Sequence, residues 1–115
     1  MGEEDRLMKV AISSNGRTLD SEVSEFFGRC ENFLIVETDG KKAEIVRNAP
    51  EGKVGGAGIS AAKTVAEKGV KAAIAGNFGP NALGVLGQFG IGAFSGKGSV
   101  RDVLRDFSKG KLRKV

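Results

Sequence analysis

The chain has 115 residues, of which 40% are hydrophobic and 28% are charged. This length is enough for one domain with a hydrophobic core and too short for two. No apolar run approaches the roughly 20 residues that cross a bilayer, and the first five residues are acidic where a signal peptide would be basic. We therefore expect one cytoplasmic domain over residues 1–115, with a loose leader at 1–6 and a basic tail at 111–115.

The formal net charge of +4 is concentrated near the end of the chain, at Lys109, Lys111, Arg113 and Lys114. Without these four residues the 18 basic residues fall to 14, which equals the 14 acidic ones, so a role with nucleic acid is not indicated. The chain has no histidine and one cysteine, Cys30. These absences exclude histidine-based acid–base catalysis, an internal disulfide and the usual zinc sites.

The first half of the chain is typical of three strands. Residues 7–12 form an apolar run that ends at the turn Ser13–Gly16, as a buried strand would. Residues 33–38 and 43–47 flank a four-residue connection that starts with Asp-Gly, which favours a hairpin. The segment from this first turn to Asn32 shows little periodicity, and we expect a loop there.

The second half alternates helices and strands. Apolar residues on one face and a following glycine predict a helix over 57–68. A second helix over 80–90 begins with proline and is weakened by interior glycines. A third, over 99–110, has a serine N-cap and apolar residues at the i, i+3, i+4, i+7 positions. Between them, residues 70–75 and 91–94 are predicted strands.

This order of elements predicts an α/β sandwich with a mixed five-stranded sheet, helices on both faces, and the second strand antiparallel to the others. Five turns would then meet at the carboxyl edge of the sheet, where open α/β sheets bind ligands. These turns are Ser13–Gly16, Phe27–Cys30, Lys53–Gly58, Gly76–Asn81 and Ser95–Ser99.

Two of these turns are rich in glycine and directly precede predicted helices. Helix starts have unpaired N–H groups and a dipole that favours anions, so the two turns predict a pocket for an anionic ligand. Neither turn matches a GxxxxGK[ST] phosphate loop, and tight turns or close packing are the alternative reason for the glycines. The candidate residues in the two turns are Gly55, Gly56, Gly58, Gly76, Asn77, Gly79 and Asn81.

Arg29 and Cys30 are the candidate side chains beside these turns. Arg29 either holds an anion through its guanidinium group or pairs with a neighbouring glutamate on the surface. Cys30 is either a small buried hydrophobic residue or a thiolate that binds metal, its pKa lowered by Arg29 and the nearby helix starts. The pair Phe26-Phe27 is interpreted as part of the core, and if exposed it would mark a surface for a partner.

Together these segments resemble the dinitrogenase iron-molybdenum cofactor family from Met8 to about Leu112. The resemblance rests on Val10-Ala11-Ile12, Ser14-Asn15-Gly16, the run from Leu19 to Arg29, Gly55-Gly56-Ala57-Gly58, and Gly76-Asn77-Phe78-Gly79-Pro80-Asn81-Ala82. It implies a ribonuclease-H-like fold and a role in binding or carrying iron-molybdenum cofactor, or its iron–sulfur precursors, during metallocluster assembly. Ser14 and Asn15 of this motif join the cofactor-binding candidates.

The chain departs from the family pattern at Phe26, where similar proteins commonly have histidine, so Cys30 is the only soft metal ligand left. A four-cysteine cluster would need sulfur from partner molecules. Asp20, Glu22 and Glu25 do not favour a two-metal nuclease, because the first strand carries no acid at its centre.

Two functional hypotheses follow. The first is a non-enzymatic carrier of an iron-molybdenum or iron–sulfur type metallocluster or precursor, which would work with cluster-assembly proteins. The second is a metal-free regulatory or interaction module that binds a small anion, a nucleotide or a protein partner.

Overall fold

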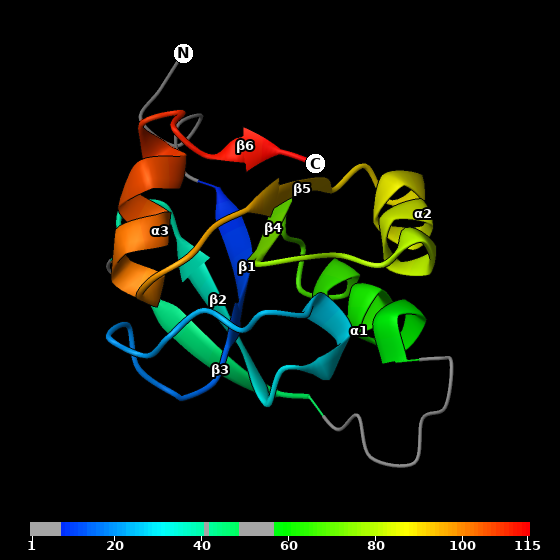
Figure 1. The fold of residues 1–115 in the computed structure, drawn as a ribbon, viewed down its shortest axis with the longest axis horizontal. Helices are drawn as coiled ribbons and strands as arrows, with labels where there is room; N and C mark the ends of the chain where they lie inside the picture. The colour runs from blue at the N-terminus through cyan, green and yellow to red at the C-terminus, as the bar shows by residue number, and fades with distance from the viewer. Residues whose placement is uncertain (1–7, 41, 49–56) are drawn as a thin grey trace.

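A six-stranded mixed sheet lies between helices in the computed structural model, which describes residues 8–40, 42–48 and 57–115 (Figure 1). The strands are β1 (Lys9–Ser14), β2 (Asn32–Glu37), β3 (Ala43–Arg47), β4 (Ala72–Ala75), β5 (Gly92–Ser95) and β6 (Arg113–Lys114). The helices are α1 (Ala57–Ala66), α2 (Pro80–Gln88), α3 (Val100–Ser108) and a short 3-10 helix, η2 (Phe27–Arg29). The mixed α/β class is confirmed, whereas the predicted leader at 1–6 lies outside the described residues.

The strand order is β3-β2-β1-β4-β5-β6. β1 pairs in parallel with β4, and β4 with β5, whereas β2 is antiparallel to both β1 and β3. The predicted direction of β2 is therefore confirmed. The predicted count of five strands is wrong for the described chain, because β6 in the basic tail adds to the sheet through Phe94–Lys114 and Ser95–Arg113 pairs.

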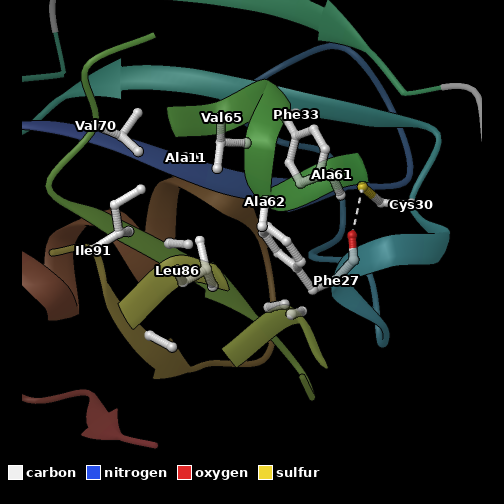
Figure 2. Close-up of a cluster of buried hydrophobic side chains, with 14 of the residues drawn as sticks. Ala11, Phe27, Cys30, Phe33, Ala61, Ala62, Val65, Val70, Leu86 and Ile91 are labelled. Atoms are coloured by element: carbon white, nitrogen blue, oxygen red, sulfur yellow. Dashed lines mark hydrogen bonds between the residues drawn. The ribbon is translucent and has the colours of Figure 1, made fainter. Parts of the chain in front are cut away.

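The two faces of the sheet carry separate hydrophobic clusters, since successive residues of a strand point to opposite sides. Ala11 belongs to the cluster under α1 and α2, which Figure 2 shows, while Val10 and Ile12 belong to the cluster under α3. Helices therefore cover both faces, as predicted. Among the described residues, none of the helices has the length and apolar character needed to span a bilayer.

The helices end where their sequences indicate. Gly69, Gly90 and Gly110 follow α1, α2 and α3 with φ of 74°, 71° and 71°, the left-handed backbone that glycine adopts without strain. The Ser99 side chain accepts a hydrogen bond of 3.1 Å from the N–H of Asp102, which confirms the predicted N-cap of α3.

The segment between β1 and η2, residues 15–26, crosses the carboxyl edge of the sheet, and we call it the crossing segment. Near its start, the N–H groups of Val100 and Arg101 donate to Ser21 and Leu19 carbonyls. Near its end, the N–H groups of Gly76 and Asn77 donate to the carbonyls of residues 24 and 25. The crossing segment thus connects the start of α3 with the turn that precedes α2.

Candidate functional site

A pocket of about 460 Å³ opens where η2 meets the first turns of α1 and α2. We call it the edge pocket. Its walls are Phe26, Phe27, Gly28, Arg29, Ala57, Gly58, Asn77, Gly79, Pro80, Asn81 and Ala82. The volume lies in the range of roughly 300–1,000 Å³ that small-molecule sites occupy.

Glycines allow the three elements around the edge pocket to approach one another. A Cβ atom on Gly28 would lie 2.8 Å from both the N and Cα atoms of Gly58, closer than real Cβ contacts come. A Cβ atom on Gly58 would lie 3.2 Å from the Cβ atom of Ala82. Close backbone packing therefore explains these two glycines and holds η2, α1 and α2 together at the pocket.

The first turn of α2 presents backbone donors to the edge pocket. Gly79 is the N-cap residue and makes no side-chain cap, and Pro80 follows at the first helical position. Because the first N–H groups of a helix have no partner within the helix, the N–H groups of Asn81 and Ala82 are available at the pocket wall. Neither α1 nor α2 has an acidic residue in its first turn, so both dipoles favour an anion here.

Among the described residues that line the edge pocket, Arg29 is the charged one, and its side chain is exposed. No ion pair within the described part of the chain includes Arg29, so the predicted alternative of a surface pair with Glu25 or Glu31 is not formed there. Glu25 instead accepts a hydrogen bond of 2.6 Å from Nδ2 of Asn77. No carboxylate is among the lining residues that the structure describes.

Cys30 lies behind the edge pocket and does not line it. Its side chain is 1% exposed, and Sγ donates to the carbonyl oxygen of Phe27 at 3.3 Å (Figure 2). Burial raises the pKa of this thiol to about 11, and hydrogen bonds, including one of 3.8 Å from Nδ2 of Asn48 to Sγ, offset only part of the rise. The prediction of a lowered pKa is therefore wrong, because loss of water outweighs the influence of Arg29 and the helix starts.

The structure brings together Arg29, Gly58, Asn77, Gly79 and Asn81 of the predicted site. Of the remaining candidates, Ser14, Asn15, Cys30 and Gly76 do not line the pocket, and Gly55 and Gly56 lie outside the described residues.

Ser14 and Asn15 do not line the edge pocket, because they are engaged within the edge of the sheet. Ser14 is fully buried, and its Oγ atom bonds both the N–H and the carbonyl oxygen of Gly16, while the N–H of Asn15 donates to the Glu22 carbonyl. The residues predicted as a turn at Ser13 and Ser14 instead continue β1. A short polar ending of a buried strand gives no apolar signal, which explains the error.

Gly76 also lies outside the lining. Its N–H donates to the carbonyl oxygen of Ser24 at 3.0 Å, and a Cβ atom on Gly76 would lie 2.8 Å from the carbonyl oxygen of Glu25. Close packing therefore explains this glycine. Gly55 and Gly56 lie outside the described residues.

Phe26 is a pocket residue that the sequence interpretation missed. Its side chain is 56% exposed and lines the edge pocket, whereas Phe27 is 1% exposed and belongs to the core. The assignment of the pair to the core is thus right for Phe27 and wrong for Phe26. In an extended segment neighbouring side chains point in opposite directions, which is the signal that would have separated them.

The edge pocket is suited to hydrogen bonding and not to metal coordination by side chains. The described residues of its lining include no thiol, imidazole or carboxylate, and the described chain contains no group of three or more His, Cys, Asp or Glu that could hold a metal ion. Arginine, amide and backbone N–H groups are donors to anions. A metal-containing ligand that fits would therefore carry its own negatively charged ligands.

Comparisons with known proteins agree with the resemblance found in the sequence. Residues 8–110 match the model of a family described as dinitrogenase iron-molybdenum cofactor. An uncharacterized protein of Methanocaldococcus jannaschii is 36% identical, with 95% of this chain and 92% of the relative covered.

Solved structures show the same similarity. The apo form of the orange protein from Desulfovibrio gigas superposes with a TM-score of 0.87 at 30% identity, over 94% of this chain and 92% of the other. A candidate NifB protein from Thermotoga has a TM-score of 0.79 at 33% identity, over 93% and 92%.

Proposed function

This chain belongs to the dinitrogenase iron-molybdenum cofactor family, and we propose that it is a non-enzymatic carrier of an anionic metal–sulfur cluster or cluster precursor. The cargo is of iron-molybdenum or iron–sulfur type and is passed between cluster-assembly proteins. The observation that carries the proposal is the meeting of Arg29, an uncapped α2 and the first turn of α1 at one pocket. Each of these features favours negative charge.

The donors of the edge pocket determine how such a cargo is held. The guanidinium of Arg29 and the N–H groups of Asn81 and Ala82 donate to sulfide or oxo atoms on the surface of the cluster. The metals keep their inorganic ligands, because none of the described lining side chains is a thiolate, imidazole or carboxylate. Release then breaks hydrogen bonds and no metal–protein bond, which suits a carrier that must give up its cargo.

Cys30 has no part in this proposal. A thiol that is buried and whose pKa is raised to about 11 stays protonated at neutral pH, whereas a metal ligand must be a thiolate. The alternative, a metal-free module for a small anion or nucleotide, is favoured by the same lack of metal ligands in the lining. Both functions use the same donors, so the test must separate the ligands.

The test is anaerobic incubation of the protein with ferrous iron, sulfide and molybdate, followed by desalting, visible spectroscopy and metal analysis per chain. We expect retained colour and metal in the wild-type protein and in Cys30→Ala. Arg29→Gln loses most of both, while Arg47→Gln, which removes an exposed arginine of β3 outside the edge pocket, retains them.

Gly79→Asp is the variant that best separates loss of binding from loss of folding. Gly79 has φ −78° and ψ 162°, the extended conformation of an N-cap, and nothing lies within 4 Å of a Cβ atom there. An aspartate at this position caps the N–H groups of α2 and adds a repelling charge, so the fold is kept and the cargo is lost. A wild-type protein that retains no metal, or retention that depends on Cys30 and not on Arg29, would overturn the carrier proposal. A thermal shift with phosphate alone would then support the metal-free module.

A further inference from the structure

A second pocket, of about 360 Å³, lies between α3 and the hairpin that joins β2 and β3. We call it the α3 pocket. Its lining comes from Leu19 of the crossing segment, from the hairpin turn at Thr38, Asp39 and Gly40, and from Arg101, Leu104, Arg105, Ser108 and Lys109 of α3 and its C-cap. Because α3 and α2 cover opposite faces of the sheet, this pocket is separate from the edge pocket (Figure 1).

The α3 pocket has an apolar floor with fixed walls. Leu104 is 6% exposed, and Leu19 packs against the same hydrophobic cluster. Gly40, with φ 74°, turns the hairpin toward the helix, so that a Cβ atom there would lie 3.9 Å from Cδ2 of Leu104. The Ser108 hydroxyl lies 3.3 Å from the carbonyl oxygen of Thr38 and joins the end of α3 to the hairpin.

Three cations border this floor. Arg101, Arg105 and Lys109 are four residues apart and therefore follow one face of the helix over about 12 Å. Arg101 pairs with Asp20 at 3.1 Å, and Arg105 pairs with aspartates of its own helix at 3.3 and 3.5 Å. Exposed pairs of this kind are weak, so a ligand anion can replace them. Lys109 forms no ion pair with any described residue.

We infer that the α3 pocket binds a small organic anion in which an apolar ring or chain is joined to a phosphate or carboxylate group. The apolar part covers Leu19 and Leu104, and the anionic part contacts Arg105 and Lys109. An inorganic anion would leave the apolar floor exposed, and a neutral apolar molecule would leave Lys109 without an ion pair to any described residue. This combination of side chains differs from the edge pocket, which offers mainly backbone donors.

The test is a titration of the ¹⁵N-labelled chain with three probes, namely AMP, adenosine and inorganic phosphate, followed by amide chemical shifts. AMP is expected to shift the amides of Gly40, Leu104 and Ser108 in a saturable way. Adenosine and phosphate are each expected to bind at least about tenfold more weakly. Shifts confined to amides of the edge pocket, such as Gly58 and Asn81, would overturn the inference, as would adenosine binding as tightly as AMP.

Variants then identify the cations. Arg105→Gln combined with Lys109→Gln should weaken AMP binding at least about tenfold, since two charged contacts are removed. Asp20→Asn should strengthen it about twofold, because the carboxylate that competes for Arg101 is gone. Lys63→Gln removes an exposed cation of α1, on the other face, and should change nothing. Unchanged binding in the double variant, with an unaltered spectrum of the free protein, would refute the site.

Discussion

The two ends of the sheet edge differ in how their helices begin. The N-cap of α3 is Ser99, whose hydroxyl accepts a hydrogen bond from the N–H of Asp102, and the first turn of α3 holds an acidic residue. The N-cap of α2 is Gly79, which provides no side-chain hydrogen bond, and the first turn of α2 holds no acidic residue. The N-cap side chain of α3 thus satisfies one of its N-terminal donors, whereas α2 has no side-chain cap and its first turn lines the edge pocket.

The surfaces around α2 and α3 also differ in how many charged side chains they carry. No charged residue occurs between Lys71 and Lys97, a stretch that includes β4, α2 and β5, whereas α3 alternates basic and acidic residues on its exposed side. In the binding proposed above, the edge pocket relies on backbone N–H groups together with Arg29, whereas the α3 pocket relies on side-chain charge. Substitutions of Gly28 and Gly58 should alter the edge pocket and leave the α3 pocket intact.

Gly28→Ala should have the largest effect on stability. The added Cβ atom would lie 2.8 Å from backbone atoms of Gly58, which cannot move independently of α1, so we expect a loss of about 2–3 kcal/mol in the free energy of unfolding. Gly84→Ala is the matched control, because nothing lies within 4 Å of its Cβ position in the exposed part of α2, and it should gain about 0.5–1 kcal/mol. Urea unfolding of the three proteins measures both changes. Equal effects would show that backbone packing does not form the pocket.

Because of Cys30, the free energy of unfolding should decrease as the pH rises in the alkaline range. The pKa of Cys30 is raised from 9.0 to about 11 in the folded state, so the folded protein holds the thiol proton more tightly than the unfolded chain does. The resulting stabilisation is fully present below pH 9 and is lost as the pH rises to about 11. Over this range the free energy of unfolding should fall by roughly 2 kcal/mol. Unfolding free energies of wild type and Cys30→Ala, measured from pH 8 to pH 11, should converge over this window. Parallel curves would contradict a buried neutral thiol.

Ser99→Ala should have a smaller effect, a loss of about 1 kcal/mol, because the N–H of Asp102 loses its cap. Gly79→Asp makes the opposite change at α2 and should gain a few tenths of a kcal/mol. Thermal unfolding at low salt compares the two. If Gly79→Asp is instead destabilised, the N-terminal N–H groups of α2 already have hydrogen-bond partners. That result would contradict the difference between α2 and α3 described above.

The parts of the fold that local patterns determine were predictable. The period of apolar residues and the serine cap located α3, and the Asp-Gly turn located the β2–β3 hairpin. That Arg29 lies beside the first turn of α1 and the turn before α2 agrees with the strand directions expected from the order of elements. The ribonuclease-H-like fold and the single-domain boundaries stay predictions.

The remaining features depend on contacts between distant parts of the chain. The crossing segment is held by hydrogen bonds to residues 76, 77, 98, 100 and 101, none of which its own sequence indicates. The burial of Cys30 and the exposure of Phe26 likewise follow from how η2 packs against α1. Sequence patterns therefore identified the elements around the site and some of its residues, such as Arg29, but not that Phe26 lines the pocket or that Cys30 is buried behind it.

The short strand β6 has a protective consequence. It pairs with β5, a strand of Gly-Ala-Phe-Ser, and places Arg113 and Lys114 at the margin of the sheet. Deleting the last three residues would leave β5 as an uncharged edge with free N–H and carbonyl groups, which invites pairing between molecules. The basic residues at the end of the chain thus act against aggregation, and shortened or carboxyl-terminally tagged versions should be designed to keep this strand.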